Sequence, residues 1–148
     1  MPNILFEDKQ LLALNKPCGV IVESDANQTN TLEAEALAYI RANEKYPDKC
    51  FIGAPHRLDK PVSGVVLLAK KKSILKQLSE TFATRDIQKT YLAIVEITPD
   101  KPSAELVHWL VKDATKRKAL ICNTEVKNST RVRLNYQVLV ENKFGTLL

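Results

Sequence analysis

The stretch of this sequence best suited to chemistry is His-Arg-Leu-Asp at residues 56–59. It brings an imidazole, a guanidinium and a carboxylate together within four positions, and Lys60 follows directly. A carboxylate such as Asp59 can act as a nucleophile or as a base. The alternative is an ordinary charged turn that carries an Arg–Asp pair. Residue types alone leave both readings open.

Other reactive side chains fit known catalytic patterns less well. Cys18 lacks the His and Asx partners of a thiol enzyme, and Ser63 lacks the Gly-x-Ser-x-Gly elbow of a serine hydrolase. The chain has three cysteines in no Cys-x-x-Cys motif and two histidines, too few for a histidine-rich metal cluster. We therefore expect no metal ion and no disulfide framework.

The charge balance favours a polyanionic partner. The chain has 148 residues, a net charge of +5 and a pI near 9.1. Basic proteins gain affinity for nucleic acids by releasing counterions from phosphates, although such charge is often only a solvated face. The basic groups are Lys70, Lys71, Lys72 and Lys76; Arg85 and Lys89; and Lys116, Arg117 and Lys118. No aromatic residues alternate with these groups, so they suggest phosphate contacts.

The chain lacks the features of a membrane or exported protein. No apolar run approaches the roughly 20 residues that cross a bilayer. The N-terminus lacks the basic and apolar regions of a signal peptide. We expect a cytoplasmic protein with no membrane partner, and the sequence indicates no obligate protein partner.

The chain must fold so that a rigid scaffold holds the 56–59 loop. Apolar runs predict strands at 11–14, 20–22 and 65–69, the last buried on both faces. Asn30 or Thr31 can cap a helix that ends near Tyr46, and Glu33 has the spacing of a capping box with Asn30. A second apolar stripe predicts a helix over 73–84.

The second half reads as β-structure. Residues 91–97 favour a strand, and residues 131–140 alternate apolar and polar side chains, so one face should be buried. With no internal repeat or convincing linker, the pattern indicates one domain over 1–148. Its fold class is α+β (or mixed α/β), a largely antiparallel sheet with flanking helices.

At residues 56–59 the sequence resembles the RluA-type RNA pseudouridine synthases. The family signature is His-Arg-Leu-Asp, a basic residue, and Ser-Gly shortly after; here Lys60 replaces the commoner Arg and Val62 the usual Thr. Three further stretches match in order, at 14–20 (Leu-Asn-Lys-Pro-Cys-Gly-Val), 65–70 and 89–95 (Lys-Thr-Tyr-Leu-Ala-Ile-Val). Four ordered matches are far more specific than a lone signature. The resemblance is loosest from 102 to 127.

The resemblance implies isomerisation of a uridine in structured ribosomal or transfer RNA, without a cofactor. Asp59 is then the essential carboxylate, and Tyr91 the active-site aromatic residue that stacks on uracil. Arg57 would fill the gap left by the flipped base, with a salt bridge to Asp59 as the alternative, and Lys60 and Lys89 would contact RNA. For Tyr91 the alternative is an aromatic side chain that faces the core of a strand. His56 fits a hydrogen bond that anchors the loop better than proton transfer.

One departure concerns the C-terminal side. The family continues into a segment resembling Thr-Gly-Arg-x-His-Gln-Ile-Arg, whose first Arg pairs with the catalytic carboxylate, and no part of 1–148 matches it. The expectation from sequence is thus a catalytic domain incomplete at its C-terminus, without a separate N-terminal RNA-binding domain. Residues 1–148 alone would then bind RNA weakly and show little activity. The alternative is a non-catalytic RNA-binding remnant of the same fold, and an unrelated hydrolase or scaffold is the least compatible with four matches.

Overall fold

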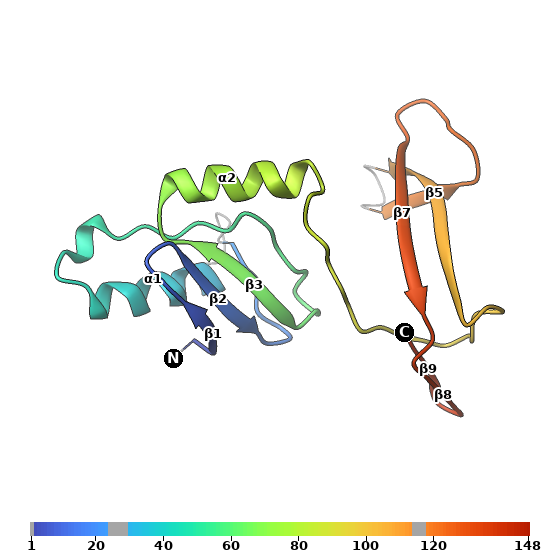
Figure 1. The fold of residues 1–148 in the computed structure, drawn as a ribbon, viewed down its shortest axis with the longest axis horizontal. Helices are drawn as coiled ribbons and strands as arrows, with labels where there is room; N and C mark the ends of the chain where they lie inside the picture. Colours follow the sequence, from blue (N-terminus) through green and yellow to red (C-terminus); the bar gives the residue numbers. More distant parts are fainter. Residues whose placement is uncertain (1, 24–29, 114–117) are drawn as a thin grey trace. The chain divides into compact units, whose positions relative to one another are not determined.

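A computed structural model describes residues 2–23, 30–113 and 118–148 (Figure 1). The chain forms two compact units, Met1–Gln88 and Lys89–Leu148. Among the described residues, no helix is both long enough and apolar enough to cross a membrane.

The first unit is built on a three-stranded antiparallel sheet in the order β1–β2–β3, with β1 at Ile4–Glu7, β2 at Leu11–Lys16 and β3 at Gly64–Ala69. The predictions at 11–14 and 65–69 are confirmed. The register pairs Leu11 with Ala69 at one end and Lys16 with Gly64 at the other, so the 56–59 loop enters the sheet beside the end of β2.

Helix α1 (Leu32–Asn43) covers one face of this sheet. Its apolar positions pack with alternate residues of β2 and β3 in a single core; the fully buried members include Leu12, Leu14, Leu32, Ala36, Val66 and Leu68. Alternation in strands and a three- to four-residue spacing in the helix place these side chains on facing surfaces. Because Val66 of β3 lies in this core, the loop before β3 has a fixed end.

The prediction of a capped helix is confirmed, with two differences of detail. Thr31 is the cap, since its hydroxyl oxygen accepts a hydrogen bond from the Ala34 amide at 3.2 Å. Glu33 does not close a capping box with Asn30 but accepts a hydrogen bond from the Ala54 amide. The helix ends at Asn43, before the expected Tyr46, and a short 3₁₀ helix (Pro47–Lys49) follows.

Helix α2 (Lys72–Ala83) follows β3, as the stripe of Leu75, Leu78 and Phe82 predicts. Those side chains are half-buried.

Two predictions about strands of the first unit are wrong. Residues 20–22 form no strand, because the Ile21 and Val22 carbonyl oxygens accept hydrogen bonds from the first amides of α1, those of Leu32 and Glu33. Strand β3 is not buried on both faces, because Val65 is 54% exposed.

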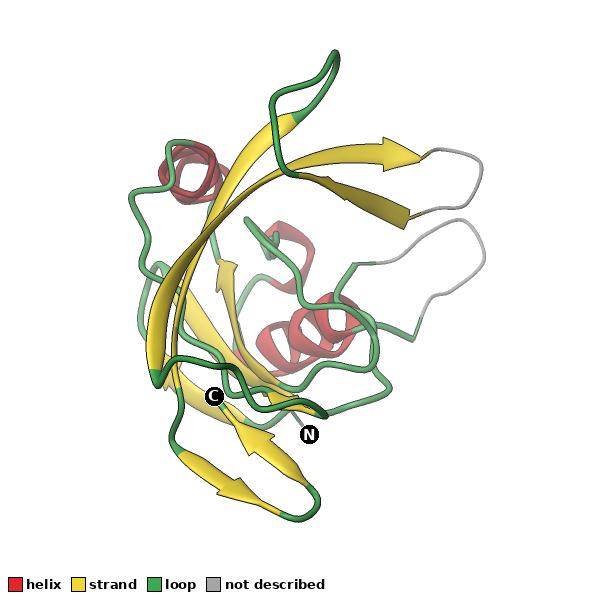
Figure 2. Ribbon diagram, turned by 90° about the vertical axis from the view of Figure 1, so that its right-hand side faces the viewer, coloured by secondary structure: helices red, strands yellow, loops and turns green. Residues whose placement is uncertain are grey.

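The second unit consists of two three-stranded antiparallel sheets. One is β6–β5–β7, formed by β5 (Ser103–Asp113), β6 (Lys118–Cys122) and β7 (Thr130–Gln137). In Figure 2 its long strands β5 and β7 are strongly curved. The other is β4–β9–β8, with β4 at Ile94–Val95, β8 at Val140–Asn142 and β9 at Gly145–Leu147.

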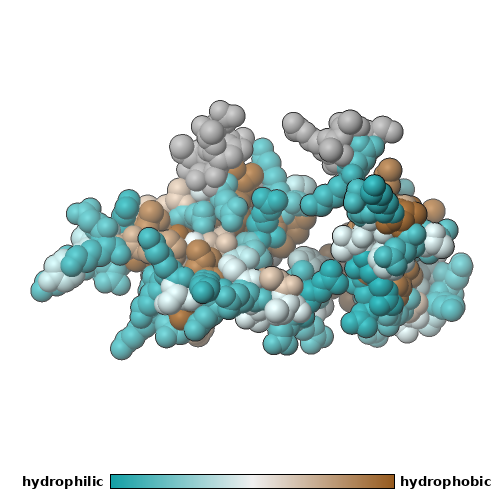
Figure 3. Space-filling view, turned by 90° about the horizontal axis from the view of Figure 1, so that it is seen from above, coloured by the Kyte–Doolittle hydropathy of each residue, from teal (hydrophilic) through white to brown (hydrophobic). Residues whose placement is uncertain are grey.

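The alternating segment 131–140 behaves differently from its prediction. It is split into β7 and β8, and its apolar side chains are at most half-buried; Leu134 is 60% exposed. No helix among the described residues of this unit covers the sheet, which leaves apolar surface visible in Figure 3. The strand expected at 91–97 is reduced to two residues, because its partner β9 is only three residues long.

All pairs between the named strands are antiparallel. The predicted α+β class, with helices beside antiparallel strands, is confirmed.

Candidate active site

The signature loop, residues 56–59 with Lys60, turns the Leu58 side chain inward and its neighbours outward. Leu58 is 9% exposed and belongs to the core of the first unit, whereas Arg57, Asp59 and Lys60 are exposed. Burial of an apolar side chain is worth about 1.5–3 kcal/mol, so Leu58 pins the middle of the loop. The carboxylate and the guanidinium therefore stand on an anchored support and face solvent.

His56 fastens the start of this loop to the elements behind it. Its Nε2 accepts a hydrogen bond from the Leu67 amide of β3 at 3.0 Å, and its ring stacks on Phe82 of α2 with centroids 4.5 Å apart. An accepting Nε2 carries no proton, so the ring proton of the neutral imidazole is on Nδ1. This geometry supports the reading of His56 as an anchor.

A third anchor comes from α1. The Glu33 carboxylate accepts a hydrogen bond from the Ala54 amide at 2.8 Å. Burial raises the pKa of Glu33 above its usual value, the Ala54 hydrogen bond lowers it in part, and the nearby Glu23 charge raises it. Glu33 thus holds the backbone two residues before the signature at some electrostatic cost.

The far side of the loop is clamped to the turn that follows β2. The Gly19 amide donates to the Lys60 carbonyl oxygen at 2.7 Å, and Gly19 has φ +89°, a conformation that favours glycine. The Lys16 side chain is fully buried beneath this clamp. Its ammonium donates to the carbonyl oxygens of Val20 at 2.7 Å, Pro17 at 3.2 Å and Lys60 at 3.4 Å.

Lys16 also places a cation behind Asp59. Burial lowers the pKa of the Lys16 ammonium, and the charges of Cys18 and Asp59 raise it in part. A buried charge is tolerated when its hydrogen bonds are satisfied. Here the three carbonyl oxygens satisfy those of the Lys16 ammonium. Lys16 therefore links two loops and lies within electrostatic reach of the candidate carboxylate.

The end of the loop is a tight entry into β3. Gly64 has φ +138°, which side chains rarely adopt, and a Cβ there would lie 3.6 Å from Leu58. The Val62 amide donates a 3.0 Å hydrogen bond to the Asp59 carbonyl oxygen, which closes a turn. This turn fixes the backbone that carries the carboxylate.

Arg57 and Asp59 do not pair with each other in this structure. Among the described residues, neither side chain takes part in an ion pair. The salt bridge considered as an alternative role for Arg57 is thus not formed, which leaves its guanidinium exposed to a ligand.

Tyr91 and Lys89 belong to the second unit, so the structure does not relate them to Asp59. Both are exposed, and they precede β4 in a segment without regular structure. Tyr91 is 56% exposed, which argues against the alternative of a core-facing strand aromatic. Of the basic groups, Lys116 and Arg117 lie outside the described residues.

Sequence reasoning missed the roles of Lys16 and Glu33. Lys16 lies in a stretch that matched the family, yet no signal in the sequence says that a lysine at the end of a strand is buried. Within the described residues, no group of three or more His, Cys, Asp or Glu side chains could hold a metal ion.

The chain resembles known proteins over nearly its whole length. Residues 10–148 match the family described as RNA pseudouridylate synthase. A ribosomal large subunit pseudouridine synthase C of Buchnera aphidicola is 30% identical over 96% of this chain and 53% of its own length. The protein of that name from Pasteurella multocida is 44% identical over 62% of this chain and 26% of its own length.

A solved structure shares the fold. Human RNA pseudouridylate synthase domain containing 4 superimposes with a TM-score of 0.75 at 28% identity, over 98% of this chain and 56% of the human one. This chain therefore spans about half the length of the relatives that cover it fully. The family match over 10–148 and the shared fold establish that the chain belongs to the RNA pseudouridylate synthase family.

Proposed function

We propose that the protein isomerises a uridine of RNA to pseudouridine, with Asp59 as the essential carboxylate. The observation that carries the proposal is the placement of Asp59. It is exposed, yet the backbone around it is held by buried Leu58, by the Gly19 amide and by the Lys16 ammonium. Catalytic groups on anchored loops beside a rigid strand have the precision that catalysis needs.

The reaction needs a carboxylate and no net redox change. The bond between N1 of uracil and C1′ of ribose breaks, the base rotates, and a bond from C5 to C1′ forms; C5 loses a proton and N1 gains one. An ionised Asp59 would act either as a nucleophile at C1′ or as a base at C2′. Both routes require the carboxylate to reach the ribose, which an exposed side chain permits.

Four further residues have proposed roles on the RNA. The target base is stacked in structured RNA and must be extruded at a cost of a few kcal/mol. The Arg57 guanidinium is planar and exposed, so it can stack in the gap left by the flipped base and at the same time donate hydrogen bonds. Lys60 and Lys89 are exposed cations suited to phosphates, and Tyr91 would stack on the uracil.

Ribosomal RNA of the large subunit is the proposed substrate. Relatives from several bacteria carry the name ribosomal large subunit pseudouridine synthase C, and this supports ribosomal over transfer RNA for the present chain. Modification of ribosomal RNA also supports a cytoplasmic location.

The deciding experiment replaces Asp59 by Asn in the full-length protein and measures pseudouridine formation in transcribed large-subunit ribosomal RNA. The change removes the charge but keeps size and polarity. We expect activity to fall by at least about a thousandfold while RNA affinity is retained. Asp86→Asn, which changes another exposed aspartate of the same unit, is the control and should be fully active. Activity of Asp59→Asn within tenfold of the parent would disprove the assignment.

The alternative is an RNA-binding protein without chemistry. It predicts that the parent protein binds RNA and yields no pseudouridine under any condition tested. The same assay separates the two.

A further inference from the structure

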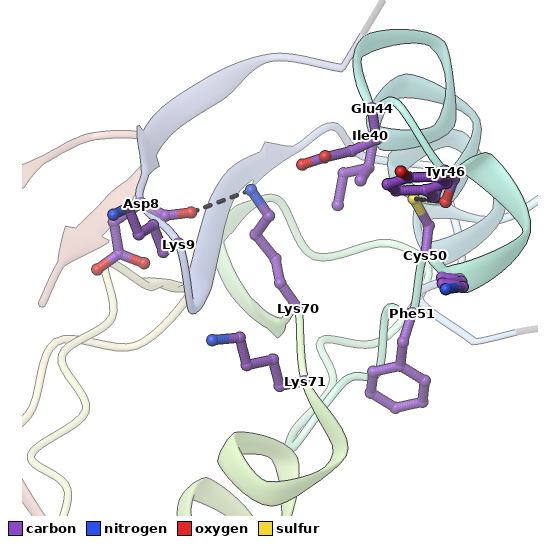
Figure 4. Close-up of a pocket in the computed structure, with 10 residues that line it drawn as sticks. Asp8, Lys9, Ile40, Glu44, Tyr46, Cys50, Phe51, Lys70 and Lys71 are labelled. Atoms are coloured by element: carbon purple, nitrogen blue, oxygen red, sulfur yellow. Dashed lines mark hydrogen bonds between the residues drawn. The ribbon is translucent and has the colours of Figure 1, made fainter.

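A concave surface of the first unit lies at the end of the sheet opposite to the signature loop. Lys16 and Gly64 mark the signature end of the β2–β3 pair, and Leu11 and Ala69 mark the other end. There the hairpin turn after β1, the end of α1 and the residues that follow β3 enclose a hollow of about 620 Å³. Figure 4 shows Asp8 and Lys9 on one side, Tyr46 and Phe51 on the other, and Lys70 between them.

The hollow carries an excess of positive charge. Its lining includes four lysines, Lys9, Lys49, Lys70 and Lys71, and two carboxylates, Asp8 and Glu44. The Asp8 carboxylate already accepts two backbone hydrogen bonds, from Gln10 at 2.7 Å and Leu11 at 2.6 Å.

The lysines differ in what they can do. Lys70 donates to the Glu7 carboxylate at 2.8 Å and to the Asp8 carbonyl oxygen at 3.0 Å, so it serves the fold. Lys9, Lys49 and Lys71 are exposed at the rim. Their positive charges are therefore available to an anion.

An aromatic side chain stands next to these cations. Tyr46 is 58% exposed, and the ammonium groups of Lys49 and Lys45 lie 5.1 Å and 5.5 Å from the centre of its ring. A base that stacked on this ring would displace one lysine from it and leave that lysine beside the phosphate of the same nucleotide. Cationic grooves with an exposed aromatic platform are the usual way in which proteins hold single-stranded nucleic acid.

We propose that this hollow binds a single-stranded nucleotide of the substrate RNA, outside the reacting uridine, with its base on Tyr46 and its phosphates on the rim lysines. The inference rests on the proposed function, which supplies RNA as the ligand. The six-residue strands β2 and β3 separate the hollow from the signature loop by roughly 20 Å.

A single strand fits better than a duplex. Stacking on a side chain requires a base that is not already stacked between neighbours, which loops and bulges provide. An acidic peptide would satisfy the lysines but would give Tyr46 no planar partner. The aromatic ring therefore selects the nucleotide among anionic ligands.

The test measures binding of the full-length protein to a 12-nucleotide single-stranded RNA and to a duplex of the same length, across a salt series. The variants are Lys9→Gln/Lys71→Gln and Tyr46→Ala, all at exposed positions. The double variant should raise Kd for the single strand about tenfold and reduce the salt slope by about 1.4, the value for two phosphate contacts. Tyr46→Ala should raise Kd about fivefold or more, and Tyr46→Phe should not.

Two controls make the result specific. Arg41 is an exposed cation of α1 that lies outside the lining, so Arg41→Gln should leave Kd and slope nearly unchanged. Single-turnover rates at saturating RNA should stay within about twofold of the parent for all variants, because the hollow is remote from Asp59. Variants that bind like the parent, or an equal loss with Arg41→Gln, would overturn the proposal.

Failure of this inference is distinguishable from failure of the proposed function. If the parent forms pseudouridine and the variants bind RNA normally, the hollow alone is wrong. If the parent forms none but binding depends on Lys9, Lys71 and Tyr46 as described, the enzymatic proposal fails and the RNA site stands.

Discussion

Lys16 and Lys60, which are 44 residues apart in sequence, are joined by a 3.4 Å hydrogen bond from the ammonium of the first to the carbonyl oxygen of the second. The same carbonyl oxygen also accepts a hydrogen bond from the Gly19 amide. Because Lys60 follows Asp59 directly, this clamp fixes the backbone immediately after the candidate carboxylate. The buried end of β2 is thus connected to the site by one side chain.

We expect Lys16→Met to lower the free energy of unfolding by about 1–3 kcal/mol, because carbonyl oxygens that lose their donor become unpaired. Turnover of the folded protein should fall with little change in KM, since Lys16 acts on the position of Asp59. Lys60→Met is the matched control: its side chain is exposed, so stability should hold and KM should rise. Equal kinetic profiles for the two variants would contradict the distinction. Denaturant unfolding and steady-state kinetics provide the measurements.

His56→Phe tests the hydrogen bond that the imidazole accepts from the Leu67 amide. A phenyl ring can still stack on Phe82 but leaves the Leu67 amide without this acceptor. We expect a loss of about 1–2 kcal/mol in the free energy of unfolding and faster hydrogen exchange at Leu67. His56→Ala, which removes the stacking too, should be less stable than His56→Phe. Unchanged exchange at Leu67 in both variants would mean that His56 does not anchor the loop.

Glu33 predicts a pH dependence with a definite sign. Its pKa is raised in the folded protein, so its favourable contribution is present below the unfolded pKa and is lost as pH rises through the folded pKa. Glu33→Gln keeps an oxygen that can accept the Ala54 amide but cannot ionise. The stability of Glu33→Gln minus that of the parent should therefore increase with pH upward from about 4.

The comparison variant for Glu33 is Glu33→Ala, which leaves the Ala54 amide without this acceptor. It should be less stable than Glu33→Gln by about 1–2 kcal/mol at every pH. Thermal unfolding across a pH series measures both effects. A difference between Gln and parent that declines with pH would refute the assigned direction.

The sequence predicted the first unit better than the second, for a physical reason. Strands β2 and β3 and helix α1 pack into one core, so their apolar positions follow the burial pattern that periodicity detects. In the second unit, β7 alternates, but no helix among that unit's described residues covers it, so alternation did not translate into burial. Strands β5 and β6 lie where the family resemblance was loosest, and neither was predicted.

The sequence singled out the exposed members of the candidate site and the anchor His56, but it missed the supporting roles of Lys16 and Glu33. The motif drew attention to Arg57 and Asp59, and the structure places both on the surface of one loop. Lys16 and Glu33 act through backbone groups of distant segments, and only the folded chain reveals which carbonyl or amide lies beside them. Sequence spacing carries no such information.

Tyr91 provides the most direct test of a role in the second unit. If its ring stacks on uracil, Tyr91→Phe keeps the platform and Tyr91→Ala removes it; stacking on an aromatic side chain is worth about 1–3 kcal/mol per base. Single-turnover rates with the full-length protein should therefore fall much further for Ala than for Phe. Leu92→Ala, at a neighbouring position that is 73% exposed, controls for disturbance of the segment and should be active. Equal loss in Phe and Ala would instead make the hydroxyl essential, and removal of the C5 proton would become the role of Tyr91.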